Sequence, residues 1–280
     1  MILFKKAKSL SNYLSQQKHK GVRIGFVPTM GALHRGHLSL IEAARKENDM
    51  IVCSIFVNPT QFNNPEDFKH YPVTMEQDIE KLLSAGCDIL FLPPKEEIYP
   101  ASFVPKQYEL GELENVLEGL YRPGHYQGVC QVVDRLLEIV SPQNIYLGAK
   151  DYQQCKVIAK LLQLLGKEDD ISIHIEPTLR EPDGLAMSSR NLRLAPEQRE
   201  AAPIIFEVLK TIKANHDQVD TSQLISAGAT ELKAKGFVID YLQIADAGSL
   251  LPASAETKNK IVLVAASIGN IRLIDNLLLN

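Results

Sequence analysis

Short apolar runs alternate with amphipathic stretches through the first half of the sequence, and this alternation constrains the fold most strongly. Buried strands are expected at residues 21–27, 50–57, 88–92, 144–147 and 171–175. Helical spacing of apolar residues is found at 37–46, 75–85 and 152–165. Repeated strand–helix–strand units predict a parallel sheet, and hence an α/β fold of the Rossmann-like type.

The alternation of strands and helices ends at the turn signal Glu181-Pro182-Asp183-Gly184. Two helical segments follow at 196–214 and 222–235, and two strand-like runs follow them at 237–244 and 260–266. We therefore expect two domains. The first is a Rossmann-like domain over 1–178, and the second is a smaller α+β C-terminal domain over 179–280. Residues 101–124 carry scattered Pro and Gly and are expected to form a long loop region over a site.

Composition narrows the class of protein. The chain has 280 residues, 45% of them hydrophobic, which is enough to bury a substantial core. The net charge of −4 gives no electrostatic reason to expect a nucleic-acid partner. No apolar run resembles a secretory leader or a membrane span, so a cytoplasmic protein is expected. Its four cysteines, Cys53, Cys87, Cys130 and Cys155, are expected to be reduced packing residues.

The most informative motif is Pro28-Thr29-Met30-Gly31-Ala32-Leu33-His34-Arg35-Gly36-His37, which lies between the first expected strand and the helix after it. His34 and His37 are three residues apart, so both imidazoles can face one side of a helix start. The free N–H groups at such a start favour a phosphate. Two alternatives remain at this point, namely a pair of capping histidines and a metal-binding pair.

Three further polar segments follow expected strands or turns. Phe56-Val57-Asn58-Pro59-Thr60-Gln61-Phe62 ends a buried strand, and its amides can both donate and accept hydrogen bonds. Gly148-Ala149-Lys150-Asp151-Tyr152-Gln153-Gln154 opens a helix and offers a cation for a phosphate. Asp183-Gly184-Leu185-Ala186-Met187-Ser188-Ser189-Arg190-Asn191 can surround a triphosphate with hydroxyls and a guanidinium. Seen singly, the last two are also ordinary helix-start and capping sequences.

Taken in order, these four motifs resemble those of pantothenate synthetases, a family of the HxGH nucleotidyltransferase superfamily. The resemblance extends from about residue 22 to the C-terminus. It implies an AMP-forming ligase that condenses (R)-pantoate with β-alanine through a pantoyl-adenylate and releases AMP and diphosphate. It also implies that Mg²⁺ accompanies ATP, that the protein is a homodimer, and that neither nucleic acid nor membrane is a partner.

The same resemblance assigns the site residues. It implies that His34, His37 and Lys150 are catalytic and that Asn58, Gln61 and Gln154 bind pantoate in the first domain. ATP would be bound by Met30, Gly31, Ala32, Leu33, His34, Arg35, Gly36, His37, Gly148, Ala149, Lys150, Asp151, Leu179, Met187, Ser188, Ser189 and Arg190, with the second domain as a lid. No metal ligand set is implied. Many members of the family have an acidic or amide residue where this sequence has Ala149, so only backbone can act there.

Some assignments stay open on sequence alone. Arg122 and His125 either line the substrate side or are structural, and Asp78 is interpreted as an exposed helical carboxylate in preference to a water-mediated Mg²⁺ ligand. Two other functions remain possible. One is a cytidylyl- or adenylyltransferase that acts on a phosphorylated acceptor through the same HxGH site, and the other is a nucleotide-binding regulatory module without turnover.

Overall fold

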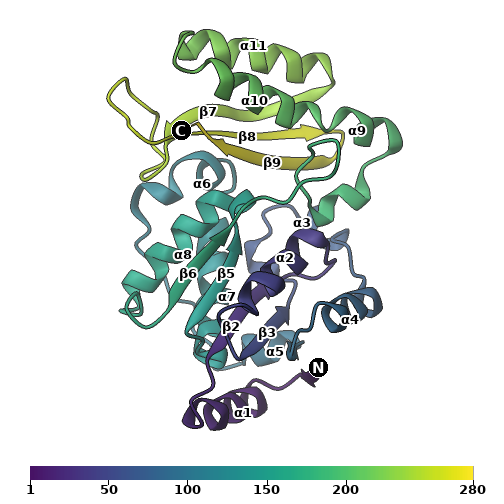
Figure 1. Cartoon of the computed structure of the whole chain (residues 1–280), viewed down its shortest axis with the longest axis vertical. Helices are drawn as coiled ribbons and strands as arrows, with labels where there is room; N and C mark the ends of the chain where they lie inside the picture. The colour runs from purple at the N-terminus through teal and green to yellow at the C-terminus, as the bar shows by residue number, and fades with distance from the viewer. Residues whose placement is uncertain (280) are drawn as a thin grey trace. The chain divides into compact units, whose positions relative to one another are not determined.

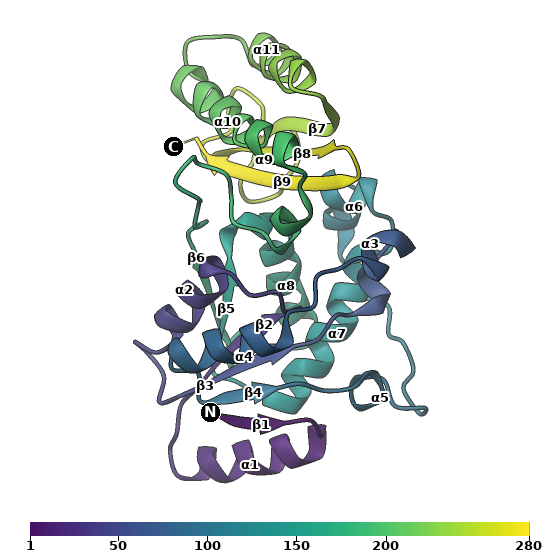
Figure 2. The same cartoon turned by 90° about the vertical axis from the view of Figure 1, so that its right-hand side faces the viewer.

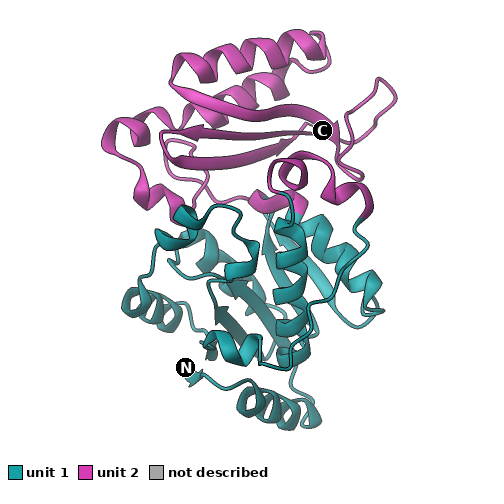
Figure 3. Ribbon diagram, turned by 180° about the vertical axis from the view of Figure 1, so that it is seen from behind, with its two compact units in different colours: residues 1–110, 123–149, 154–177 teal, residues 111–122, 150–153, 178–280 magenta. Residues whose placement is uncertain are grey.

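The computed structural model describes residues 1–279, which divide into two compact units (Figures 1 and 3). The first unit comprises residues 1–110, 123–149 and 154–177, and the second comprises 111–122, 150–153 and 178–280. The last of these segments begins next to the domain boundary expected from the sequence. The two short segments, by contrast, fall within the range expected for the first domain and belong to the second unit.

A six-stranded parallel sheet forms the first unit, in the order β1-β4-β3-β2-β5-β6. Its strands are β1 (Ile2–Phe4), β2 (Ile24–Thr29), β3 (Met50–Ile55), β4 (Ile89–Phe91), β5 (Asn144–Gly148) and β6 (Ser172–Glu176). The expected α/β class with a parallel sheet is confirmed. β2, β3 and β5 are almost wholly buried, which explains why their sequences read as continuous apolar runs.

Helices cover the sheet. The longer ones are α1 (Ala7–His19), α2 (Arg35–Ala44), α4 (Met75–Ser84), α7 (His125–Val140) and α8 (Tyr152–Leu164). The shorter ones are η1 (Pro59–Gln61), α3 (Pro65–Lys69), α5 (Lys95–Ile98) and η3 (Ala149–Asp151). α2 and α4 supply Leu40, Ile41 and Leu82 to a buried cluster with β3 and β4. α1 and α7 contact each other, and Figure 2 shows α7 and α8 on the other side of the sheet from α2, as right-handed crossovers require.

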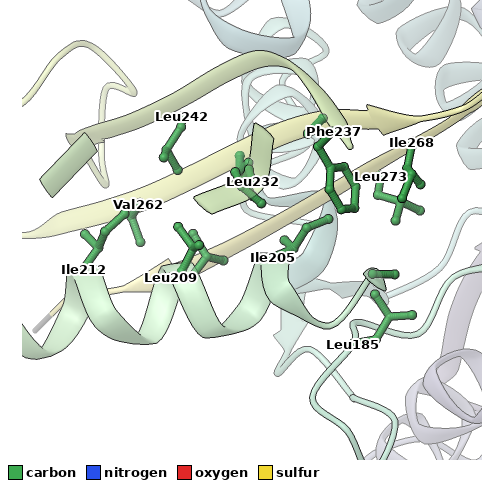
Figure 4. Packing of buried hydrophobic residues seen from close by; sticks show 14 of the residues in the cluster. Leu185, Ile205, Leu209, Ile212, Leu232, Phe237, Leu242, Val262, Ile268 and Leu273 are labelled. Carbon is green, nitrogen blue, oxygen red and sulfur yellow. The ribbon is translucent and has the colours of Figure 1, made fainter. Parts of the chain in front are cut away.

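The second unit is built on an antiparallel sheet of β7 (Phe237–Asp246), β8 (Lys260–Ile268) and β9 (Ile271–Leu278). Its helices are η2 (Gly111–Glu114), α6 (Leu117–Tyr121), η4 (Ser189–Arg193), α9 (Pro196–Ala201), α10 (Ile204–Asn215) and α11 (Thr221–Ala234). Figure 4 shows Leu209 and Ile212 of α10 packing toward Val262 of the sheet. The expected continuous helix over 196–214 is instead two helices, with Pro203 between them.

Residues 111–122 join the second unit through their apolar side chains. Leu117 is buried with Ala245, Leu250 and Leu263, and these residues form a cluster separate from the one under α10. The expectation of a long loop over 101–124 is therefore wrong for its second half, where η2 and α6 form. A five-residue helix is too short to show a helical period, so nothing in this stretch of sequence signals it.

All four cysteines are buried free thiols, as expected. Burial raises the pKa of the Cys53 thiol and raises that of Cys87 to about 11. Both therefore remain protonated packing residues at neutral pH. Within the described residues, no helix combines the length and the apolar character that crossing a bilayer requires.

Candidate functional site

Three neighbouring strands of the first unit end at the same edge of the sheet. β2 lies between β3 and β5, and all three run parallel, so the segments that follow Thr29, Ile55 and Gly148 leave from one edge. The chain order reverses here, because β3 and β4 lie on one side of β2 whereas β5 and β6 lie on the other. Ligands of open α/β sheets bind at such a switch point, beyond the carboxyl ends of the strands.

The two histidines cap the helix that follows β2. His34 is the N-cap of α2; its Nδ1 accepts from the Gly36 N–H at 3.2 Å, while the His34 N–H donates to His37 Nδ1 at 3.3 Å. The ring centroids are 4.0 Å apart. Because each Nδ1 accepts from the backbone, the neutral imidazole with its proton on Nε2 satisfies both bonds. Each ring thus carries an Nε2–H donor at a helix N-terminus.

The turn before these histidines is fastened by Asp78, which is buried on α4. The Asp78 carboxylate accepts from the backbone N–H groups of Ala32 and Leu33, both at 2.8 Å, and from the Thr74 hydroxyl at 3.0 Å. Lys81, one turn further along α4, donates to the Leu33 carbonyl at 2.6 Å. The expectation that Asp78 is an exposed carboxylate is therefore wrong, since its oxygens are used to hold the turn.

These hydrogen bonds stabilise a turn whose backbone is strained. Gly31 and Ala32 both have positive φ angles, +82° and +49°. A Cβ at position 31 would lie 3.0 Å from the Ile55 side chain and 3.2 Å from the Asp78 carboxylate, and the positive φ adds strain for any side chain, so glycine is favoured there. Ala32 in the left-handed region costs roughly 1–2 kcal/mol, which its bond to Asp78 helps to offset.

The segment after β3 contains two buried amides. Asn58 caps η1, and its Nδ2 donates to Gln61 Oε1 at 3.1 Å and to the Gly128 carbonyl at 3.0 Å. The Gln61 Nε2 lies 3.1 Å from Met30 Sδ, so the second motif touches the first. His125 begins α7, is buried, and bonds through Nδ1 to the Gln61 carbonyl oxygen at 2.8 Å. The sequence left open whether His125 lines the substrate side or is structural, and its bond to Gln61 is a structural contact.

The segment after β5 turns through η3 into α8, and its residues are divided between the units. Gly148 and Ala149 belong to the first unit, whereas Lys150 and Asp151 belong to the second. The Lys150 ammonium lies 3.2 Å from the Asp151 carboxylate. Asn276 of β9 donates to the Lys150 carbonyl oxygen at 2.8 Å, so the backbone at this lysine is held by the sheet of the second unit.

The two adjacent glutamines at the start of α8 have different surroundings. Gln153 is buried, and it accepts from the Glu118 N–H and donates to the carbonyls of Leu113 and Val116. Gln154 lies half-buried on the same first turn, within the first unit. Gln153 therefore holds the segment 111–122.

The serine-rich loop of the second unit follows a narrow hairpin. The Met187 N–H donates to the Leu179 carbonyl, and Ser188 caps η4 by accepting from the Arg190 N–H at 3.3 Å. Arg180 anchors the hairpin through a bidentate pair with Asp275, at 2.6 and 3.0 Å. Burial raises the pKa of Asp275 in spite of the Arg180 guanidinium beside it. Ser188 thus shows the helix capping that was one of the two interpretations of this loop from its sequence.

Within the first unit the structure thus gathers Met30 to His37 and Asn58 to Gln61, and within the second it gathers Lys150 with Asn276 and Leu179 with Met187. Sequence reasoning missed the role of Asp78 and that of Tyr99, whose hydroxyl donates to Asn58 Oδ1 at 2.9 Å. Burial of Asp78 had a weak signal, because it is flanked by Met75, Ile79 and Leu82 at helical spacing. Tyr99 had none.

A parallel sheet with a switch point, and a histidine-capped helix N-terminus at its carboxyl edge, define a nucleotide-binding α/β protein of the HxGH type. The sequence matches the family model described as pantoate-beta-alanine ligase over residues 2–278. It is 44% identical over 285 residues to the pantothenate synthetase of Aquifex aeolicus, covering 98% of each chain. With that of Pseudomonas fluorescens it shares 45% identity over 279 residues, covering 99% of this chain and 97% of the relative.

Solved structures agree with these relatives. A crystal structure of pantothenate synthetase from Thermus thermophilus matches with a TM-score of 0.93 and 42% identity, covering 100% of this chain and 99% of that one. The pantoate-beta-alanine ligase of Francisella tularensis, complexed with β-γ ATP and β-alanine, matches with a TM-score of 0.85 and 39% identity, covering 100% and 98%. The chain belongs to the pantoate-beta-alanine ligase family. It is an enzyme that condenses pantoate with β-alanine at the expense of ATP, and neither alternative function is supported.

Proposed function

We propose that this ligase works through a pantoyl-adenylate formed at the histidine-capped N-terminus of α2. In the first step a carboxylate oxygen of pantoate attacks the α-phosphorus of ATP and diphosphate leaves. In the second step the amine of β-alanine attacks the acyl carbon and AMP leaves. The observation that carries this proposal is the pair of imidazoles of His34 and His37 at a helix start, each of which accepts a backbone N–H at Nδ1.

The physical reason is that negative charge shifts onto the phosphates during the first step. Preorganised N–H donors and a helix N-terminus stabilise that charge without having to reorient. Because both imidazoles already accept at Nδ1, His34 and His37 act as neutral hydrogen-bond donors and not as bases. Met30, Gly31, Ala32, Leu33, Arg35 and Gly36 contribute the backbone around this phosphate site.

In the second unit, we propose that Lys150 neutralises charge at the α-phosphate and that Asp151 accepts from the ribose hydroxyls. The ion pair between them restrains the flexible lysine side chain. Ser188, Ser189 and Arg190 bind the departing diphosphate, with Leu179 and Met187 holding their hairpin. The backbone of Gly148 and Ala149 completes the nucleotide site, and residues 179–280 act as the lid.

Pantoate is proposed to bind to Gln61 and Gln154 in the first unit, and Asn58, the third residue that the family resemblance implies, to contribute by holding Gln61 through its own amide. Its carboxylate must be held in line with the α-phosphorus, because correct positioning supplies much of the rate in a two-substrate reaction. The link between Gln61 and Met30 supports this placement, since it sets the amide beside the turn that leads to His34.

Mg²⁺ is proposed to accompany ATP. Residues 1–279 contain no cluster of three or more His, Cys, Asp and Glu side chains suited to a metal, so the donors present fit an ion held chiefly by phosphate oxygens and water. When bound, it neutralises phosphate charge. We further propose that the enzyme is a cytoplasmic homodimer, as the family resemblance implies.

The proposal is tested by pantoate-dependent exchange of diphosphate into ATP, measured without β-alanine. His37→Ala should lower this exchange by about a hundredfold or more, the size expected for loss of a preorganised donor. His19→Ala, which removes an exposed histidine at the end of α1, is the matched control and should exchange normally. Near-normal exchange in His37→Ala would refute the role of the paired histidines. Exchange that does not require pantoate would refute the adenylate.

A further inference from the structure

A chain of hydrogen bonds joins Tyr99 to Gln61 through Asn58, all within the first unit. Tyr99 directly follows α5, and its ring lies against Phe56 and Phe103, with centroids 6.2 and 4.9 Å away. The Tyr99 hydroxyl donates to Asn58 Oδ1 at 2.9 Å. Burial raises the pKa of this phenol above its ordinary value, so the hydroxyl keeps its proton and remains a donor at neutral pH.

These bonds fix which way the Asn58 amide faces. Its Oδ1 receives hydrogen bonds from the Tyr99 hydroxyl, from the Thr60 hydroxyl at 3.0 Å and from the Thr60 backbone N–H at 3.4 Å, and the last of these can only donate, so this atom must be the oxygen. The Nδ2 on the other side donates to the Gly128 carbonyl and to Gln61 Oε1. Reversing the amide would set its N–H groups against the Thr60 backbone N–H and its oxygen against the Gly128 carbonyl.

The orientation of Asn58 in turn determines that of Gln61. Gln61 Oε1 accepts from Asn58, so the Nε2 amide group must point the other way, where it lies 3.1 Å from Met30 Sδ. A thioether is a weak acceptor, and an oxygen of a substrate can compete with it for these N–H groups. Gln61 thus presents a donor, beside the residue that precedes the Gly31 turn.

We propose that Gln61 serves the acid substrate only as an N–H donor, and that Tyr99 is the positioning residue that fixes it in this role through Asn58. The inference rests on the proposed binding of pantoate at Gln61. It specifies the chemistry of that site, because an oriented donor selects an acceptor oxygen of the acid, either of its carboxylate or of a hydroxyl.

Three variants test the donor role, with KM for pantoate, KM for ATP, kcat and the melting temperature measured for each. Gln61→Glu keeps the shape and the acceptor for Asn58 but replaces the N–H donor with a carboxylate oxygen. We expect its KM for pantoate to rise about tenfold or more, at least as much as for Gln61→Ala, with KM for ATP unchanged. A Gln61→Glu enzyme with normal KM for pantoate would overturn the donor role.

Tyr99→Phe keeps the ring contacts and removes only the hydroxyl. We expect KM for pantoate to rise about threefold to tenfold while KM for ATP and kcat at saturating pantoate change less than twofold. Tyr108→Phe is the control, because it removes a buried phenol bonded to Asp134 in the same unit and should leave every KM unchanged. If Tyr99→Phe folds poorly, Thr60→Val removes the second donor to the same oxygen from an exposed position.

The outcomes separate the two proposals. If Gln61→Ala raises KM for pantoate but neither Tyr99→Phe nor Thr60→Val does, the positioning role is refuted and the pantoate site stands. If Gln61→Ala leaves KM for pantoate unchanged, the proposed site itself is refuted. An equal rise in KM for pantoate, ATP and β-alanine in Tyr99→Phe would indicate general loss of structure and would also overturn the positioning role.

Discussion

The Asp78 carboxylate accepts the backbone N–H of Ala32 at 2.8 Å, although the two residues are 46 positions apart in the sequence. A buried side chain of α4 thereby holds a residue with a positive φ angle two positions before His34. Because the helix cap begins where this turn ends, the orientation of the histidine rings depends on a carboxylate that need not touch substrate.

Asp78→Asn should therefore lower both stability and activity. The amide offers one acceptor oxygen where three donors now converge, so the free energy of unfolding should fall by about 1–3 kcal/mol. Pantoate-dependent ATP–diphosphate exchange should fall as well. Urea denaturation and the exchange assay measure the two effects. Glu76→Gln, on an exposed position of the same helix, is the control, and a variant that matches it in both assays would contradict the holding role.

Gly128→Ala should impair the pantoate site through packing. A Cβ at this position would lie 2.3 Å from the Thr60 carbonyl oxygen and 2.8 Å from the Gln61 nitrogen, so α7 and η1 would have to separate. We expect a loss of about 1–3 kcal/mol in the free energy of unfolding and a higher KM for pantoate. Gln131→Ala, less than one turn further along α7, should change neither quantity. A Gly128→Ala enzyme with normal KM for pantoate would show that this close approach does not shape the site.

Acid should weaken the second unit through Glu118. Burial alone would raise the pKa of this carboxyl, but the bidentate Arg272 guanidinium, Arg122 and the Tyr241 hydroxyl outweigh it and lower the pKa to about 2. A carboxyl with a depressed folded-state pKa contributes stability that is complete above its unfolded pKa and is lost as pH falls toward the folded value. The contribution of Glu118 should thus fade between about pH 4.5 and pH 2.

The measurement is the difference in free energy of unfolding between the wild type and Glu118→Gln as a function of pH. Taking this difference removes the effects of other carboxyls with lowered pKa, such as Asp183. We expect a constant difference at neutral pH that shrinks as pH falls toward 2. A difference that stays constant throughout the acid range would contradict the depressed pKa.

Ser54→Ala should leave the protein as stable as the wild type or more stable. Ser54 lies in β3, its side chain is fully buried, and its hydroxyl has no hydrogen-bond partner among residues 1–279. Burying such a group costs about 1–3 kcal/mol, and alanine removes that cost while leaving only a small void. Thermal and urea denaturation would check this. A loss of more than about 1 kcal/mol would indicate that the hydroxyl is satisfied, for example by a buried water.

The sequence predicted best those elements whose pattern is local. The β-branched run 50–57 became β3, and the helical spacing at 75–85 became α4. α7 was not predicted, although Gln127, Gln131, Arg135 and Glu138 lie at helical spacing on its less buried side. β9 has no counterpart among the expected strands, and its strand character depends on pairing with β8.

The candidate site divides in the same way. Residue types that suit phosphates and acids drew attention to the paired histidines and to the segments around Asn58 and Lys150, and the family resemblance assigned their roles. What holds them comes from distant parts of the chain, as Asp78 does for His34, Tyr99 for Asn58 and Asn276 for Lys150. Such contacts depend on tertiary packing, and no spacing within one sequence encodes them.

Because each unit is assembled from several separate segments of the chain, a fragment cut at one boundary lacks part of its own unit. The polypeptide passes between the two units at 110/111, 122/123, 149/150, 153/154 and 177/178. A fragment starting at residue 178 would therefore include Arg272 without Glu118, and Ala245 and Leu263 without Leu117. During synthesis, Glu118 must wait for Arg272, which lies 154 positions further along the chain, before the ion pair between them can form. Expression of the C-terminal part alone should yield an aggregation-prone product, whereas supplying residues 111–122 and 150–153 through linkers should rescue it.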